Sequence, residues 1–186
     1  MTSTTPTTTT TLPLRPGTWT LDPLHSTVGF TVRHLGISKV RGTFTDFDAS
    51  LTVGETPADT SVEALIQTAS IDTGNTDRDD HVRTGDLLDV EQRPTIAFRS
   101  TSIAGAGDEW ALEGELSIGD VTRPITLDVE LGGIQLHPAD GRHHAGFEAR
   151  GELRRKDFGV DFGTMFEAAL GQVIRIELDL QLLEPA

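Results

Sequence analysis

The sequence predicts an all-β protein: a single, closed antiparallel barrel of about eight strands with short helices. Three observations support this fold class. Apolar and polar residues alternate along most of the chain after Pro16, which is typical of antiparallel strands with one dry face. Glycine and proline turn signals separate the alternating runs. The length of 186 residues fits one domain.

The alternation is clearest at residues 26–33, 109–118 and 174–182. Within residues 39–53, the apolar positions change from even to odd numbers. A slip of one residue reverses the face of every side chain, so this change predicts a β-bulge near Thr45–Asp46. Further strands are expected at residues 61–69, 95–102, 125–131 and 146–153.

Two segments interrupt the strand pattern. Residues 76–90 are predicted to form one or two short helices, broken near Gly85, with Asn75 or Thr76 as the N-cap. Residues 157–170 contain Asp-Phe-Gly twice, which predicts turns followed by a helical turn. Closure of the sheet is expected because it removes the exposed edges of a long open sheet.

Composition excludes several classes of protein. With 15 basic and 29 acidic residues, the net charge of -14 disfavours nucleic acids and anionic membranes as partners. Cysteine is absent, which excludes disulfides and thiolate metal sites. No apolar run reaches the ~18 residues of a membrane helix, so we expect no stable membrane insertion. The sequence is also compatible with a homodimer, because a bulged strand edge can pair across a twofold axis.

Residues 1–13 form a Thr-rich segment of low complexity, which we expect to be a disordered tail. The segment lacks the basic start and apolar centre of a secretory signal, so a cytoplasmic location is expected. Residues 14–186 are then the barrel domain.

An eight-stranded barrel is either filled by side chains or left open for one small ligand. The chain has only 10 aromatic residues, 8 Phe and 2 Trp, to fill it. Many positions expected to point inward are small, which favours an open interior with apolar walls and a long apolar ligand; they are Gly29, Gly42, Ala64, Gly114, Ala149 and Gly151. The alternative is that large neighbours interleave with these positions and fill the core.

Polar residues form four clusters along the chain, at residues 21–26, 70–81, 121–124 and 154–159. No spacing of His and Asp matches a recognised metal pattern, and His137, His143 and His144 are expected to be solvated in a loop. We therefore predict no metal, no cofactor and no catalytic set, although a Ser26–His–Asp arrangement stays open because triads are spatial. Structural roles are equally compatible with the clusters: a plug of Asp72, Asn75, Arg78 and Asp79, and a pair of Arg155 with Asp157.

Several motifs, in order, resemble the YceI-like family over about residues 17–183. The most specific is the stretch Ser70-Ile71-Asp72-Thr73-Gly74-Asn75-x-x-Arg78-Asp79-x-His81. Others are His25-Ser26-x-Val28-x-Phe30-x-Val32-x-His34-Leu35-Gly36, Val40-x-Gly42-x-Phe44-x-x-Phe47-Asp48, Pro94-x-Ile96-x-Phe98-x-Ser100, Gly119-x-Val121-Thr122-Arg123-Pro124 and Arg155-x-Asp157-Phe158-Gly159. The chain departs from the family pattern at Arg93, where an aromatic is usual, and at the shortened segment before the last strand.

The resemblance implies an extended, lipocalin-like barrel whose apolar tunnel binds polyisoprenoids or similar long-chain amphiphiles, such as prenyl quinones. The expected function is binding, sequestration or transport of such a lipid. Tunnel-wall candidates are Val28, Phe30, Val32, Val40, Phe44, Phe98 and Leu116, and head-group candidates are His34, Arg41, Asn75, Arg78 and His81. Two alternatives are an enzyme that acts on a lipid by general acid–base catalysis in the same cavity, and a ligand-free interaction protein. We expect no enzyme activity.

Overall fold

The computed structural model describes residues 11–186, apart from the side chains of residues 165 and 166. The predicted disordered tail therefore lies mostly outside the described residues. The strands are β1 (Gly17–Leu21), β2 (Thr27–His34), β3 (Ser38–Phe44), β4 (Phe47–Val53), β5 (Ser61–Gln67), β6 (Ile71–Asp72), β7 (Thr95–Ala106), β8 (Glu109–Ile118), β9 (Val121–Leu136), β10 (His143–Arg154) and β11 (Leu170–Leu183). The α-helices are α1 (Thr76–Arg83) and α2 (Gly163–Glu167), and the 3₁₀ helices are η1 (Pro23–His25), η2 (Pro57–Asp59), η3 (Thr68–Ser70) and η4 (Arg155–Phe158).

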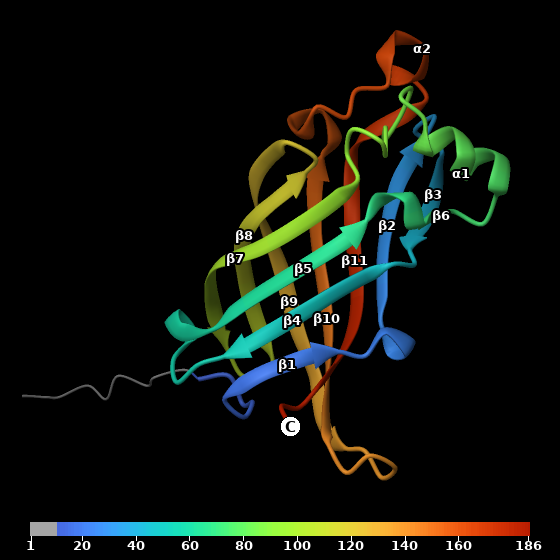
Figure 1. The fold of residues 1–186 in the computed structure, drawn as a ribbon. Helices are drawn as coiled ribbons and strands as arrows, with labels where there is room; N and C mark the ends of the chain where they lie inside the picture. The colour runs from blue at the N-terminus through green and yellow to red at the C-terminus, as the bar shows by residue number, and fades with distance from the viewer. Residues whose placement is uncertain (1–10) are drawn as a thin grey trace, which may run out of the picture.

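These strands form one antiparallel sheet that closes on itself (Figure 1). β1 pairs with β4 on one side and with β11 on the other, and this second pairing closes the ring. β2 continues along the same edge of β11 and pairs with β3 on its other side. Three consecutive pairs (β1 with β2, β3 with β4, and β5 with β6) each form one interrupted strand of the barrel, so the eleven strands correspond to eight barrel strands. The predicted closed barrel of eight antiparallel strands is therefore confirmed.

The predicted bulge lies at the break between β3 and β4. β3 ends at Phe44 and β4 begins at Phe47, so Thr45 and Asp46 fall between them. The Thr45 amide donates to the Ser70 carbonyl at 3.2 Å, and the Asp46 carbonyl accepts from the Gln67 amide at 2.9 Å. The change of parity thus keeps Phe44 and Phe47 on the same face of the sheet, where both line the barrel interior.

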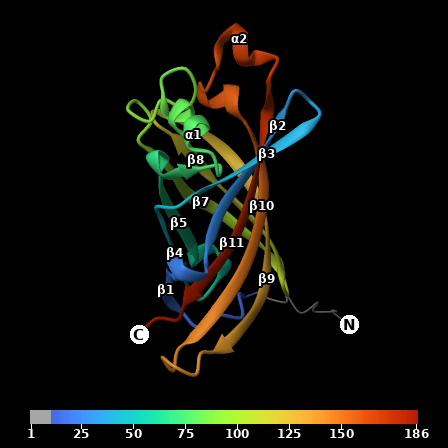
Figure 2. The same cartoon turned by 90° about the vertical axis from the view of Figure 1, so that its right-hand side faces the viewer.

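The two ends of the barrel differ. We call the end with α1, α2 and the β2–β3 hairpin the upper end, and the end with the β9–β10 hairpin the lower end (Figures 1 and 2). A packed apolar cluster closes the lower part around Trp19, which is 1% exposed and donates from Nε1 to the Arg15 carbonyl at 2.9 Å. Its other buried members are Leu14, Leu21, Leu51, Val53, Leu131, Ala145, Phe147 and Leu182.

Helix α1 begins as predicted and ends earlier than predicted. The Asn75 side chain accepts from the Arg78 amide at 2.9 Å and caps the N-terminus, as the sequence predicted. The helix ends at Arg83, and the following residues to Arg93 form hydrogen-bonded turns, so a second helix before Val90 is not formed. The first Asp-Phe-Gly repeat ends η4 with a turn at Gly159, and the second leads into α2, which begins at Gly163. Both glycines have positive φ, 70° and 65°.

Candidate functional site

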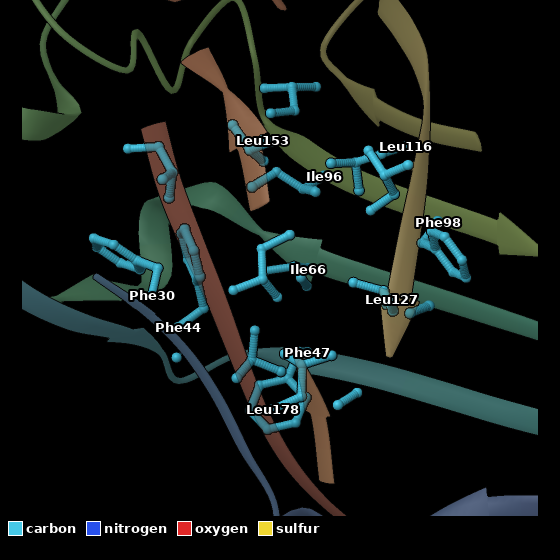
Figure 3. Close-up of a pocket in the computed structure, with 18 of the residues that line it drawn as sticks. Phe30, Phe44, Phe47, Ile66, Ile96, Phe98, Leu116, Leu127, Leu153 and Leu178 are labelled. Carbon is cyan, nitrogen blue, oxygen red and sulfur yellow. The ribbon is translucent and has the colours of Figure 1, made fainter. Parts of the chain in front are cut away.

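The barrel encloses a cavity of about 540 Å³. Its wall extends from Leu180 and Leu182 near the lower end to His34 and Leu170 near the upper end. Figure 3 shows Phe30, Phe44, Phe47 and Ile66 around the cavity, with Leu178 of β11 beside them. The size lies within the range of small-molecule binding sites, about 300–1,000 Å³.

Strand alternation builds the wall. Val28, Phe30 and Val32 of β2 line the cavity together with Gly29, whereas Thr31 and Arg33 do not. The rings of Phe30 and Phe44 lie 5.6 Å apart across the β2–β3 pair, tilted by 42°. All seven wall candidates line the cavity, which places them where an apolar ligand would lie.

The sequence prediction omitted one complete face of β11. Five of its residues line the cavity at every second position: Ile174, Ile176, Leu178, Leu180 and Leu182. The signal was the alternation itself, since five consecutive apolar residues of one parity are typical of a dry sheet face. Helix α1 and the turn after it add Val82, Leu87 and Leu88 to the wall.

Three of the six small residues that favoured a hollow barrel do not leave space open. A Cβ on Gly42 would lie 2.4 Å from the Phe30 ring, and one on Gly114 would lie 2.3 Å from the Phe98 ring. A Cβ on Gly151 would lie 2.5 Å from Leu127. At these positions the interleaving alternative is correct, because each glycine accommodates a large neighbour. Ala64 and Ala149, by contrast, line the cavity.

Polar wall residues gather at the upper end, and we call this set the polar end of the cavity. They come from the end of β2, the turn after β6, helix α1 and the start of η4. The set consists of His34, Thr73, Arg78, His81 and Arg155. Outside this set, the polar members of the described wall are Asp48 and Ser50 of β4. A ligand with one polar end and a long apolar body matches this distribution.

Thr73 fixes helix α1 at the polar end. The buried Asp79 carboxylate accepts from the Thr73 amide at 2.9 Å and from its hydroxyl at 2.6 Å. Arg78 Nε donates to the same hydroxyl at 2.6 Å, and its Nη2 donates to the Thr73 carbonyl at 2.8 Å. Of the predicted plug, Arg78 and Asp79 bond to Thr73, Asn75 caps the helix, and Asp72 accepts from the Gly74 amide.

Three of the five head-group candidates meet at the cavity, and two lie elsewhere. His34, Arg78 and His81 line the polar end. Arg41 is exposed on the outer face of β3, because it alternates with the inward residues Val40 and Gly42. Asn75 is exposed, and its side chain is engaged by the helix cap.

Arg155 is a wall residue that the prediction did not include. It is 1% exposed, and its guanidinium donates to the carbonyls of Val160, Leu170 and Gly171 at 3.1–3.3 Å. The charge lies 4.2 Å from the centre of the Phe162 ring. Its ionic partners among residues 11–186 are Asp161 at 4.0 Å and Glu167 at 3.8 Å, so the predicted pair with Asp157 was wrong.

These contacts make Arg155 a clamp between the Asp-Phe-Gly segment and the start of β11. A buried guanidinium is tolerated only when its donors are satisfied, which the three carbonyls accomplish. A hydrogen bond from Lys156, followed by the charges of Lys156 and Arg155, holds the pKa of Glu167 below its ordinary value. Helix α2 is thereby kept ionically attached to the upper end.

At the lower end, His137, Asp140 and His144 bring ligand-type atoms within 4.8 Å of one another. Gln181 Nε2 donates to His144 Nδ1 at 2.7 Å and to Asp22 Oδ2 at 3.3 Å. His144 therefore carries its hydrogen on Nε2 and donates it to Asp140 Oδ2 at 2.9 Å. A metal would need the lone pair of that nitrogen, so this hydrogen-bond pattern opposes coordination.

The prediction that these three loop histidines are solvated was wrong for His144. Its side chain is 11% exposed, and its ring stacks on His137 with centroids 4.7 Å apart. The Arg142 amide, followed by the His144 ring, lowers the pKa of the Asp140 carboxyl. The contact between His144 and Gln181 could not be predicted from the sequence, because Gln181 lies on another strand near the C-terminus.

Among the hydrogen bonds of residues 11–186, none joins the Ser26 hydroxyl to a histidine. Its oxygen accepts from the backbone amide of Gln181 at 2.9 Å. The Asp22 carboxylate instead receives His25 Nδ1 at 2.7 Å and the Leu24 amide at 3.0 Å. Burial raises the pKa of Asp22, but these hydrogen bonds outweigh it, and the pKa lies below its ordinary value. The arrangement caps η1 and joins it to β11.

The sequence of this barrel matches a known protein family. The YceI-like domain model matches residues 19–182, which is most of the chain. The chain belongs to the YceI-like family. It is 42% identical over 137 residues to protein YceI of Escherichia coli O6:H1 (strain CFT073), covering 73% of this chain and 71% of that protein.

Solved structures of other proteins share this fold. BcnA of Burkholderia cenocepacia superposes on this YceI-like barrel with a TM-score of 0.76 at 22% identity, covering 87% of this chain and 98% of that one. A polyisoprenoid-binding domain from Saccharophagus degradans gives a TM-score of 0.64 at 14% identity, covering 90% and 98%. At these identities the likeness shows the fold. In residues 11–186, no helix has both the length and the apolar character needed to span a membrane.

Proposed function

We propose that this protein binds a polyisoprenoid or a similar long-chain amphiphilic lipid, such as a prenyl quinone, inside the barrel, and that it sequesters or transports the lipid. The observation that carries the proposal is the cavity of about 540 Å³ with an apolar wall and polar residues gathered at its upper end. A chain of apolar units with one polar head has this same division along its length.

The apolar wall is sufficient to hold such a ligand. Burial of one five-carbon isoprene unit contributes up to about 4 kcal/mol, at about 0.8 kcal/mol per carbon. Association costs about 4–15 kcal/mol in lost freedom of motion. A few buried units therefore outweigh the cost of association, and no polar contact is needed for affinity.

The polar end supports an orientation with the head group at the top of the barrel. Arg78 donates from Nε and Nη2 to Thr73, and its Nη1 makes no hydrogen bond to a residue that the structure describes. That remaining donor and the ring of His34 are suited to an anionic or carbonyl head group. A further argument comes from the similar fold of the Saccharophagus degradans domain, which is described as polyisoprenoid-binding.

A tryptophan placed inside the barrel tests the proposal. Ala64 lines the cavity, and its neighbour Leu65 points outward and is 44% exposed. We expect Ala64→Trp to weaken binding of a soluble prenyl alcohol at least about tenfold, because the indole occupies the space of several carbons. Leu65→Trp is the matched control and should bind as the wild type, measured by isothermal titration calorimetry.

Two outcomes would contradict the proposal. One is a wild-type protein that binds no prenyl or alkyl amphiphile. The other is equal binding by both tryptophan variants, with circular dichroism showing both to be folded. Release of a chemically altered ligand would instead favour the alternative of an enzyme that uses the same cavity.

A further inference from the structure

The β2–β3 hairpin presents an unusual turn at the upper end of the barrel, where Figure 2 shows it projecting beside α2. The Ile37 amide donates to the His34 carbonyl at 3.2 Å and closes the turn. Its two central residues, Leu35 and Gly36, have positive φ of 51° and 71°. Such turns favour Asn or Gly at both positions. A large apolar side chain at Leu35 therefore costs stability without contributing to the turn.

The apolar side chains of this hairpin tip face solvent. Ile37 is 83% exposed and Leu35 is 55% exposed. Single exposed apolar residues are ordinary on protein surfaces. Here two of them adjoin at the end of a projecting hairpin, next to a residue, His34, that lines the polar end of the cavity.

Three cations surround the tip. Arg33 and Lys39 lie directly opposite each other on β2 and β3, and Arg41 follows on the outer face. No salt bridge joins any of the three to a residue between 11 and 186, whereas Arg83, Arg99, Arg150 and Arg175 each pair with a carboxylate. Like charges directly opposite on a sheet are destabilising. Two acidic residues lie near these cations in the strand register. Glu177 accepts a hydrogen bond from Thr31, the residue opposite Arg41, and Asp72 pairs with Thr43, two residues from Arg41.

We propose that the β2–β3 hairpin docks this protein on the surface of an anionic phospholipid bilayer. Leu35 and Ile37 enter the boundary between headgroups and acyl chains, and Arg33, Lys39 and Arg41 contact lipid phosphates. The net charge of -14 repels such a surface. Screening limits that repulsion to about 8 Å at physiological salt, so the charges at the contact decide the outcome.

Docking in this orientation brings the polar end of the cavity to the bilayer. The hairpin continues into His34, and the Leu35 amide donates to the Ala169 carbonyl at 2.7 Å, next to Leu170 of the wall. A lipid leaving the membrane would therefore meet the cavity at this end. This last step rests on the proposed function, whereas the docking itself rests on the hairpin alone.

Vesicle co-sedimentation of the full chain tests the docking. We expect binding to phosphatidylcholine vesicles that contain phosphatidylglycerol, and little binding to phosphatidylcholine alone. Ile37→Ser should weaken the partition coefficient about tenfold, and the double variant R33E/K39E about 30-fold. Two matched controls should stay within about twofold of the wild type: Leu24→Ser, at an 87% exposed residue of η1, and Arg99→Glu, at a cation paired with Glu63.

Several results would overturn the docking proposal. They are no binding of the wild type to anionic vesicles, equal losses in Ile37→Ser and Leu24→Ser, or a dimer that depends on Ile37 without vesicle binding. Titration with a soluble prenyl alcohol in the absence of vesicles separates the two proposals. Hairpin variants with normal ligand binding but no docking confirm the hairpin's role, and a wild type that docks but binds no ligand contradicts only the proposed function.

Discussion

The two ends of this barrel are built from the same kind of strand and differ in what fills them. At the lower end, Trp19 and its neighbours pack into an apolar cluster. The His144–Gln181–Asp22 hydrogen bonds join residues next in sequence to its members Leu21, Ala145 and Leu182. Toward the upper end, the strands enclose a cavity. The rings of Phe30 and Phe44 contact each other, and both line this cavity. We propose that the lower end contributes mainly stability and that the upper part binds the ligand.

Truncation of one large residue at each end gives the largest expected effect. Trp19→Ala should lower the free energy of unfolding by about 4 kcal/mol, because the indole is fully packed and its N–H is bonded. Phe44→Ala should cost about half as much, because its ring already faces the cavity. Urea denaturation followed by circular dichroism measures both values. Equal losses would contradict the division between the two ends.

Acid should lower the stability of the lower end by protonating Glu184. We expect this loss to be smaller than that of the two truncations. The Glu184 carboxylate accepts from the His143 amide at 2.7 Å and pairs with Arg15, and the His143 hydrogen bonds lower its pKa from 4.5 to about 2. A lowered pKa contributes stability above the unfolded value, which is lost as the pH falls through the folded value. The stability gap between wild type and Glu184→Gln should therefore be full at pH 7 and shrink between about pH 4.5 and pH 2.

Thermal denaturation across that pH range provides the measurement. Glu148→Gln in β10, the strand that contains His143, is the control, since Glu148 is exposed and pairs with Arg150. A gap that is independent of pH, or one that widens in acid, would contradict the role assigned to Glu184.

Much of the fold follows from the alternation of apolar residues. Strand β8 has the predicted bounds, 109–118, because its apolar positions alternate without a break. β1 was not predicted, since its five residues contain only Trp19 and Leu21 as large apolar side chains. β9 begins at Val121, four residues before the predicted start, and includes Pro124. In that part β9 pairs with β8 alone, and proline is tolerated where one strand edge is free.

The candidate site was predictable in part. Alternation identifies which residues share a face, and the structure places the predicted wall residues around the cavity. It does not identify the lower-end network, since Gln181 and Asp22 meet only after the barrel closes. Nor does composition distinguish Ala64, which borders open space, from Gly114, which lies under the Phe98 ring. That distinction depends on packing between neighbouring strands.

Native mass spectrometry of the purified full chain is the most direct test of lipid binding inside the barrel. We expect a bound lipid mass that disappears after extraction with organic solvent. Addition of a prenyl alcohol should then restore an adduct and raise the melting temperature, because a ligand that binds only the folded state stabilises it. A protein that never carries a lipid adduct and shows no thermal shift with any prenyl or alkyl amphiphile would contradict lipid binding inside the barrel.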